Sequence, residues 1–109
     1  MQGEDKVVDW YRGHGYEVVD RNWHCRAGEI DIVAVRDGEL VFCEVKTRAT
    51  DRFGSPAHAV NIEKQRRIRR LAVAWLSERG VRDVRLRFDV ACVVGLGDSA
   101  VVEVIEAAF

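Results

Sequence analysis

Apolar and polar positions along this chain follow two periods, and each period predicts one kind of element. In residues 3–14, apolar side chains recur at spacings of three and four, which is the period of a helix, and glycines follow as a stop. Strand-like apolar runs predict three strands after it, and Asp37-Gly38 between the last two is a strong hairpin signal. These strands are expected at residues 16–21, 29–35 and 40–47, with a polar loop at residues 22–28.

The second half of the chain predicts the longest helix, over residues 62–79. Apolar residues at helical spacing form one face of it, and Gly80 is a typical helix end. A loop is expected before it at residues 48–61, with one helical turn after Pro56. The order αβββαββ predicts an α/β protein in which helices flank a central mixed sheet. The last two strands are expected at residues 84–94 and 100–105.

The composition limits the size and class of the protein. With 109 residues, 48% of them hydrophobic and 32% charged, the chain predicts one globular domain over residues 1–109. No apolar run approaches the ~20 residues of a membrane span, and the acidic N-terminus differs from a signal peptide, so no membrane partner is expected. Three widely spaced cysteines disfavour a disulfide framework and favour a reducing, cytoplasmic location.

Ionisable side chains interrupt two of the apolar strands. Asp31 lies in the second predicted strand, and Glu44 and Lys46 lie in the third. Burial of a charge is costly unless a partner compensates it. Glu44 and Lys46 share one face because alternate side chains do, and the predicted hairpin brings Asp31 close to Glu44. Two facing carboxylates repel each other, and bound Mg²⁺ removes that repulsion because it takes oxygen ligands.

This arrangement predicts phosphodiester hydrolysis. Two carboxylates can hold a divalent cation, and Lys46 can orient the attacking water or stabilise charge on the phosphate. The alternative is a salt bridge between Glu44 and Lys46 on a solvated strand face. That alternative fits poorly with the apolar neighbours on the same strand, and it leaves Asp31 unexplained.

The same residues resemble a known signature. Asp31 followed by Glu44-Val45-Lys46 resembles the PD-(D/E)XK nuclease motif, with Ile30 in place of the nominal proline. Longer stretches are similar to the small bacterial YraN-like family, which implies the restriction-endonuclease-like fold. These stretches are Asn22-Trp23, residues 28–34 and residues 40–48, with further similarity at residues 53–56, Lys64, residues 72–76 and residues 87–90.

An acid on the first helix extends this resemblance. The archaeal Holliday-junction resolvases share the fold and carry an additional acidic residue on their first helix, and Glu4 matches that position. The resemblance therefore implies that Glu4 completes the acidic cluster. The alternative is an ordinary acid near a helix N-terminus, which complements the helix dipole.

Basic residues gather on the predicted long helix, where five of the seven positions 64–70 are Lys or Arg. Arg66, Arg69 and Arg70 are expected on an exposed face, where they would contact phosphates and make binding dependent on salt. A solvated helix face is the alternative. The formal net charge of −1 means that DNA contact depends on such a local patch. Lys64 would join the patch or, like Gln65, point into the active site, and Arg48 and Arg52 would clamp the DNA backbone.

These features predict a metal-dependent DNA endonuclease acting on branched or damaged DNA. Asp31, Glu44 and the Val45 carbonyl would bind Mg²⁺ or Mn²⁺, while Lys46 positions water and Glu4 supports the cluster. A non-catalytic module that binds nucleic acid or a protein partner is compatible with the same sequence, as is a subunit active only in a complex. A homodimer would supply two sites for cutting two strands. Asp89, in a core strand, is expected to have a structural role.

Overall fold

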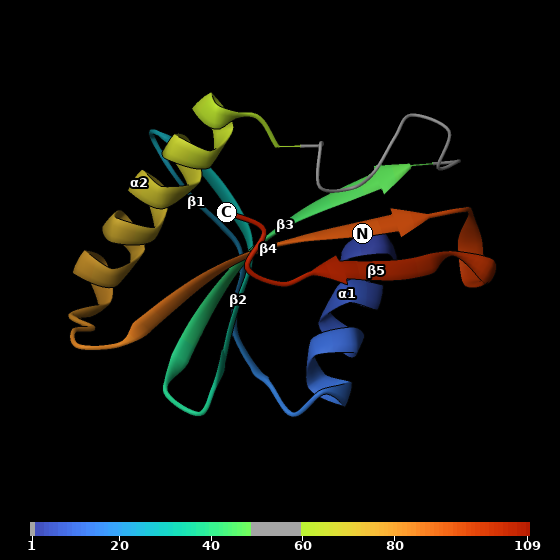
Figure 1. The fold of residues 1–109 in the computed structure, drawn as a ribbon, viewed down its shortest axis with the longest axis horizontal. Coiled ribbons are helices and arrows are strands. Elements are labelled where there is room, and N and C mark those ends of the chain that lie inside the picture. The colour runs from blue at the N-terminus through green and yellow to red at the C-terminus, as the bar shows by residue number, and fades with distance from the viewer. Residues whose placement is uncertain (1, 49–59) are drawn as a thin grey trace.

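A computed structural model describes residues 2–48 and 60–109 and shows a five-stranded sheet between two helices (Figure 1). This architecture confirms the predicted fold class, an α/β protein with a mixed sheet in the order αβββαββ, and it is consistent with a restriction-endonuclease-like fold. The elements are α1 (Gln2–Gly13), β1 (Glu17–Cys25), β2 (Gly28–Arg36), β3 (Glu39–Arg48), α2 (Ile62–Arg79), β4 (Arg85–Val94), the 3-10 turn η2 (Gly97–Ser99) and β5 (Val101–Ile105).

The strands lie side by side in their order along the chain, β1-β2-β3-β4-β5. β3 and β4 pair in parallel, whereas the other neighbouring strands pair antiparallel. A parallel pair needs a crossover, and α2 lies in the connection between β3 and β4. The β2–β3 hairpin turns at Asp37 and Gly38, which both have positive φ (52° and 76°), as the sequence predicted.

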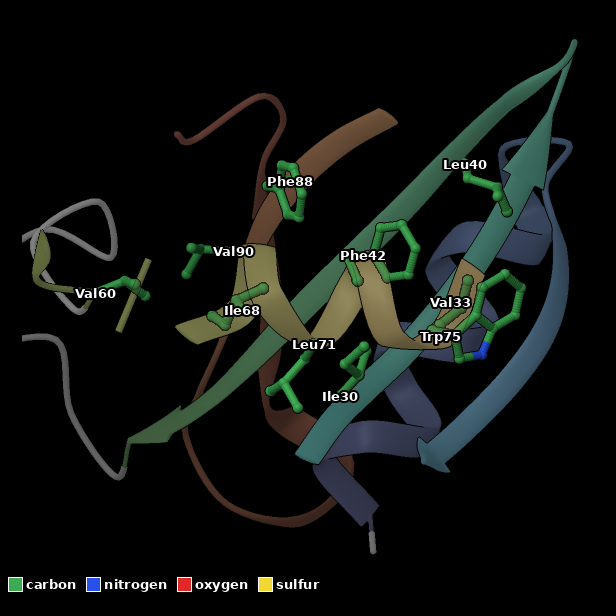
Figure 2. Packing of buried hydrophobic residues seen from close by; sticks show 11 residues of the cluster. Ile30, Val33, Leu40, Phe42, Val60, Ile68, Leu71, Trp75, Phe88 and Val90 are labelled. Carbon is green, nitrogen blue, oxygen red and sulfur yellow. The ribbon is translucent and has the colours of Figure 1, made fainter. Parts of the chain in front are cut away.

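The two helices cover opposite faces of the sheet, and each face has its own apolar core. On one face, α2 contributes Ile68, Leu71 and Trp75, which pack against apolar side chains of β2, β3 and β4 (Figure 2). Phe42 meets Trp75 edge to face, with ring centroids 5.7 Å apart. On the other face, α1 packs Val7, Val8 and Tyr11 against the sheet. The sheet is therefore buried on both sides, and a charged group in its middle must have a partner.

The loop predicted for residues 22–28 is wrong at its N-terminal end, because β1 continues to Cys25. Trp23 pairs with Ile30 and Cys25 with Gly28, so β1 and β2 form a hairpin with a short turn. This part of β1 is mostly exposed and polar, and Asn22 has a positive φ of 50°. Pairing with β2 and the packing of Trp23 against the α2 core outweigh the polar local sequence.

Two sequence predictions fall on residues outside the described ranges, namely the helical turn after Pro56 and the contact of Arg52 with DNA. Within the described residues, no helix combines the length and apolar character needed to cross a membrane.

Candidate active site

Asp31 lies where the pairing between β2 and β3 ends. The register runs from Arg36–Glu39 to Ile32–Cys43 and goes no further. Ile30 packs in the α2-side core and Ile32 in the α1-side core, although residues two apart share a face in a regular strand. β2 therefore changes face at Asp31. The Asp31 carboxylate replaces the missing backbone partner, because its Oδ2 accepts a hydrogen bond from the Val45 N–H at 2.7 Å.

Glu44 is a buried carboxylate that two lysines share. Its side chain is buried in the sheet, with 8% of the residue exposed. The Nζ of Lys64 lies 2.7 Å from Glu44 Oε1, and the Nζ of Lys46 lies 3.6 Å from the same oxygen. The ion pair between Glu44 and Lys46 that was considered as the alternative is thus present, but on a covered face of the strand and with Lys64 as the closer partner.

The first turn of α2 holds Lys64 in place. Asn61 caps the helix, and its side-chain oxygen accepts a hydrogen bond from the Lys64 N–H at 2.9 Å. Lys64 comes one turn before Ile68, which packs into the core, so both side chains face the sheet. Helix and strands enclose a cleft of about 190 Å³ lined by Gly28, Glu29, Asp31, Glu44, Lys64, Arg67, Ile68 and Leu71.

Groups of like charge lie close together in and beside the cleft, carboxylates around Asp31 and two lysines at Glu44. Burial raises the pKa of Asp31 to about 6, the Val45 N–H opposes that rise, and the charges of Glu44, Glu4 and Glu29 add to it. The neighbouring Lys64 ammonium and burial lower the pKa of Lys46. For Lys64 burial acts in the same direction, but the contact with Glu44 outweighs it and raises the pKa of Lys64. Asp31 consequently favours a cation beside it.

Glu4 joins this cluster from the opposite layer. Only 2% of Glu4 is exposed, and its charge contributes to the raised pKa of Asp31. The Nε and Nη2 atoms of Arg21 each lie 3.4 Å from Glu4 Oε1, and Arg21 also binds Asp5 at 2.6 Å. Glu4 is in the first turn of α1, so its position also suits the alternative role of an acid that complements the helix dipole. The sequence did not indicate Arg21 as the partner of Glu4. Arg21 lies on β1 and Glu4 on α1, and a local sequence pattern does not show which residues of a strand a helix will contact.

The oxygen atoms at the cleft fit a hard divalent cation. Within residues 2–48 and 60–109, no three His, Cys, Asp or Glu side chains are already arranged around a common metal position. Mg²⁺ does not require such a set, because it commonly takes one or two carboxylates and completes its shell with waters and substrate phosphates. For such an ion, Asp31 and Glu44 would supply the carboxylates. The Val45 carbonyl lies on the same strand edge as its N–H, which is bonded to Asp31.

A family model described as "Uncharacterised protein family UPF0102" matches residues 3–93. The chain belongs to this family. It is 48% identical over 108 residues to a UPF0102 protein of Rhodococcus jostii, an alignment that covers 98% of this chain and 92% of the relative. A UPF0102 protein of Myxococcus xanthus is 44% identical over 107 residues, covering 98% and 85%. One of Geobacter sulfurreducens is 48% identical over 101 residues, covering 92% and 78%.

UPF0102 is the YraN-like family, with a restriction-endonuclease-like nuclease fold, so the resemblance inferred from the sequence is confirmed. The matched range includes every residue that lines the cleft, from Gly28 to Leu71, and also Glu4.

The predicted basic residues of this UPF0102 protein separate into two groups. Arg66, Arg69 and Arg70 are exposed on α2, as expected, and the Arg69 guanidinium also lies 4.7 Å from the centre of the Phe88 ring. Arg48 is exposed at the end of β3. The cleft instead receives Lys64 and also Arg67, which sequence reasoning did not single out. The spacing of three between them was the signal that could have found Arg67.

Two other polar residues serve the fold. The Gln65 amide donates to the Val60 carbonyl at 3.2 Å, so Lys64 rather than Gln65 enters the cleft. Asp89 is fully buried, and both its oxygens accept hydrogen bonds from Arg87 at 2.9 Å. Asp89 also accepts a hydrogen bond from the Tyr11 hydroxyl at 2.6 Å and another from the Ala107 N–H at 3.0 Å. The structural role predicted for Asp89 is confirmed by this fully satisfied set of partners.

Proposed function

We propose that this UPF0102 protein is a metal-dependent endonuclease that hydrolyses phosphodiester bonds in DNA, with branched or damaged DNA as its substrate class. The observation that carries the proposal is the pair Asp31 and Glu44 at the point where β2 and β3 separate, with two lysines beside it in an open cleft. A folding role alone gives no reason to gather three buried or half-buried carboxylates at one place.

The divalent cation would be held by Asp31, Glu44 and the Val45 carbonyl, and Mg²⁺ or Mn²⁺ there would supply Lewis-acid activation of the phosphate and of the attacking water. The lysines provide the rest of the chemistry. Lys46 is 20% exposed beside Glu44, so its ammonium can donate a hydrogen bond to a water in the cleft and fix its direction of attack. Lys64 and Arg67 offer cationic donors to the non-bridging phosphate oxygens.

The water oxygen would then attack phosphorus in line with the leaving sugar oxygen, so that one P–O bond forms as the other breaks. The proton that the water loses would pass to solvent, and the leaving sugar oxygen would take up a proton from solvent. Exposed Arg66 and Arg70 on α2 continue the positive surface away from the cleft and would contact neighbouring phosphates. Two copies of the chain would be required for a symmetric cut in both strands of a duplex.

One observation favours a second function, that of a DNA-binding module or a subunit that cuts only within a complex. Glu44 is already neutralised by Lys64 at 2.7 Å and by Lys46, so the cleft holds together without a metal. In that case the basic face of α2 would bind nucleic acid while the carboxylates remain structural.

The deciding experiment is cleavage of end-labelled four-way junction, flap, duplex and single-stranded DNA in Mg²⁺ or Mn²⁺, with Lys46→Ala in parallel. We expect the wild type to cut at least one substrate and Lys46→Ala to be slower by about 10²–10³-fold, with DNA binding and thermal unfolding preserved. Glu44→Gln should abolish cutting as well.

Equal cutting by the wild type and Lys46→Ala would reject this site as the source of the activity. Shifted bands without products, lost in the Arg66→Ala and Arg70→Ala variants, would instead support the binding module.

A further inference from the structure

Lys64 makes the closest ionic contact of the cleft, and it makes it with a carboxylate that the proposed function assigns to a metal. Its Nζ lies 2.7 Å from Glu44 Oε1, against 3.6 Å for Lys46. The contact joins helix to strand, and a third of the Lys64 side chain is exposed to solvent. A lysine and a divalent cation cannot both occupy the same carboxylate oxygen without strong repulsion.

The charges around the cleft balance before any metal is added. Among the charged groups that line the cleft or lie beside Glu44, three carboxylates face three cations. The carboxylates are Glu29, Asp31 and Glu44, and the cations are Lys46, Lys64 and Arg67. A divalent cation would leave two positive charges in excess, and the diester phosphates of a nucleic acid carry the matching negative charge.

We propose that Lys64 is the resident counter-ion of Glu44, and that it moves from this carboxylate to a substrate phosphate when a divalent cation binds. This inference rests on the proposed metal site. It makes metal and nucleic acid bind as a pair: each raises the affinity for the other, by the same factor. The free protein then binds divalent cations weakly.

The cleft offers Lys64 a second position, beside Arg67, where it could contact a phosphate. Arg67 lies one helical turn further along α2 on the same side, and both side chains line the cleft. A phosphate between them would have a point charge from Lys64 and the planar donors of Arg67. Lys46 is less suited to this movement, because it is fixed on the same strand as Glu44 and is only 20% exposed.

The test is Mn²⁺ binding, measured by titration calorimetry on chelator-treated protein, with and without an uncleavable phosphorothioate oligonucleotide duplex. Lys64→Met should bind Mn²⁺ about tenfold more tightly than the wild type in the absence of DNA, because the competing ammonium is gone. The duplex should tighten Mn²⁺ binding to the wild type and have a much smaller effect on Lys64→Met.

Two variants serve as controls. Arg70→Met removes one positive charge from an exposed position of the same helix that does not line the cleft, so it should weaken DNA binding and leave Mn²⁺ affinity unchanged. Lys64→Arg keeps the charge and should stay close to the wild type. Lys64→Gln replaces Lys64→Met if the methionine variant fails to fold by circular dichroism.

An unchanged or weaker Mn²⁺ affinity in Lys64→Met would overturn the inference, as would equal tightening in Arg70→Met. The result is separable from DNA cleavage: tighter Mn²⁺ binding in a protein that cuts nothing would retain the counter-ion and reject the nuclease. Cleavage by the wild type, with no gain of Mn²⁺ affinity in Lys64→Met, would retain the nuclease and reject the counter-ion role of Lys64. Absence of Mn²⁺ binding in every variant would reject both.

Discussion

At the scale of single residues, Asp31 both completes the hydrogen bonding of the sheet and lies among other carboxylates. Its Oδ2 accepts the Val45 N–H where the β2–β3 ladder stops, while the charges of Glu44 and Glu4 lie close enough to oppose its ionisation. Sequence alone identified Asp31, Glu44 and Lys46, since a charge inside an apolar strand is conspicuous. It left open whether Lys64 joins the exposed basic patch or enters the active site, because the Lys64–Glu44 contact depends on how α2 crosses the sheet.

The raised pKa of Asp31 makes the metal-free protein sensitive to pH. Asp31 ionises near its ordinary pKa of 3.8 when the chain is unfolded, whereas the folded protein keeps it protonated up to about pH 6. The folded state binds more protons between these values, so the free energy of unfolding falls as pH rises through that window. In Asp31→Asn this loss should be absent, and the variant should gain on the order of 1 kcal/mol over the wild type above the window.

Urea unfolding in a chelator, at pH values below and above the window, measures this difference. A stability difference between wild type and Asp31→Asn that is the same at both pH values would contradict the expectation. Adding Mg²⁺ should stabilise the wild type and leave Asp31→Asn nearly unaffected.

At the scale of elements, α2 is a helix whose bounds the local sequence predicts correctly. The predicted range 62–79 is the observed one, because the helix has an unambiguous apolar face and Gly80 ends it with φ of 65°. β1 shows the opposite case. Its second half lies on the exposed edge of the sheet and is mostly polar. The local sequence therefore predicted a loop, whereas pairing with β2 makes this segment a strand. The buried elements, the edge strand β5 and the first half of β1 were predictable, whereas the polar second half of β1 was not.

The cap of α2 ties the stability of an element to the cleft. Asn61→Ala removes the acceptor of the Lys64 N–H and should lower the free energy of unfolding by about 1 kcal/mol. Asn61→Asp keeps an acceptor and favours the helix dipole, so it should stay close to the wild type. Urea unfolding of both variants measures the effect. Equal destabilisation by Ala and Asp would show that the cap bond is not what Asn61 contributes.

At the scale of the whole molecule, Asp89 joins parts of the chain that are far apart in sequence. It binds Tyr11 of α1, Arg87 of its own strand and the backbone after β5, and Arg87 continues to Tyr16 and Glu39. No local pattern predicts which arginine or tyrosine such an acid will meet. The sequence could indicate a structural role for Asp89, and the three-dimensional arrangement supplies its partners.

Removing Asp89 should therefore loosen the entire domain. Asp89→Ala leaves Arg87 and Tyr11 without their buried acceptor and should cost about 3–5 kcal/mol of unfolding free energy. Tyr11→Phe removes one of several donors and should cost about 1–2 kcal/mol. Chemical unfolding measures both changes. A loss in Asp89→Ala no larger than that in Tyr11→Phe would show that the network does not act as one unit.

The parallel pairing of β3 with β4 also bears on the order in which the chain folds. β1, β2 and β3 are joined by tight turns, so their contacts are local, whereas β4 joins β3 only after a crossover that includes α2. Local contacts close at the lower entropic cost. The hairpins can therefore bring Asp31 and Glu44 together before α2 delivers Lys64. Until α2 docks, Lys46 is the one of the two lysines that can offset the charge of Glu44, so we expect the repulsion between Asp31 and Glu44 to slow this step of folding at neutral pH.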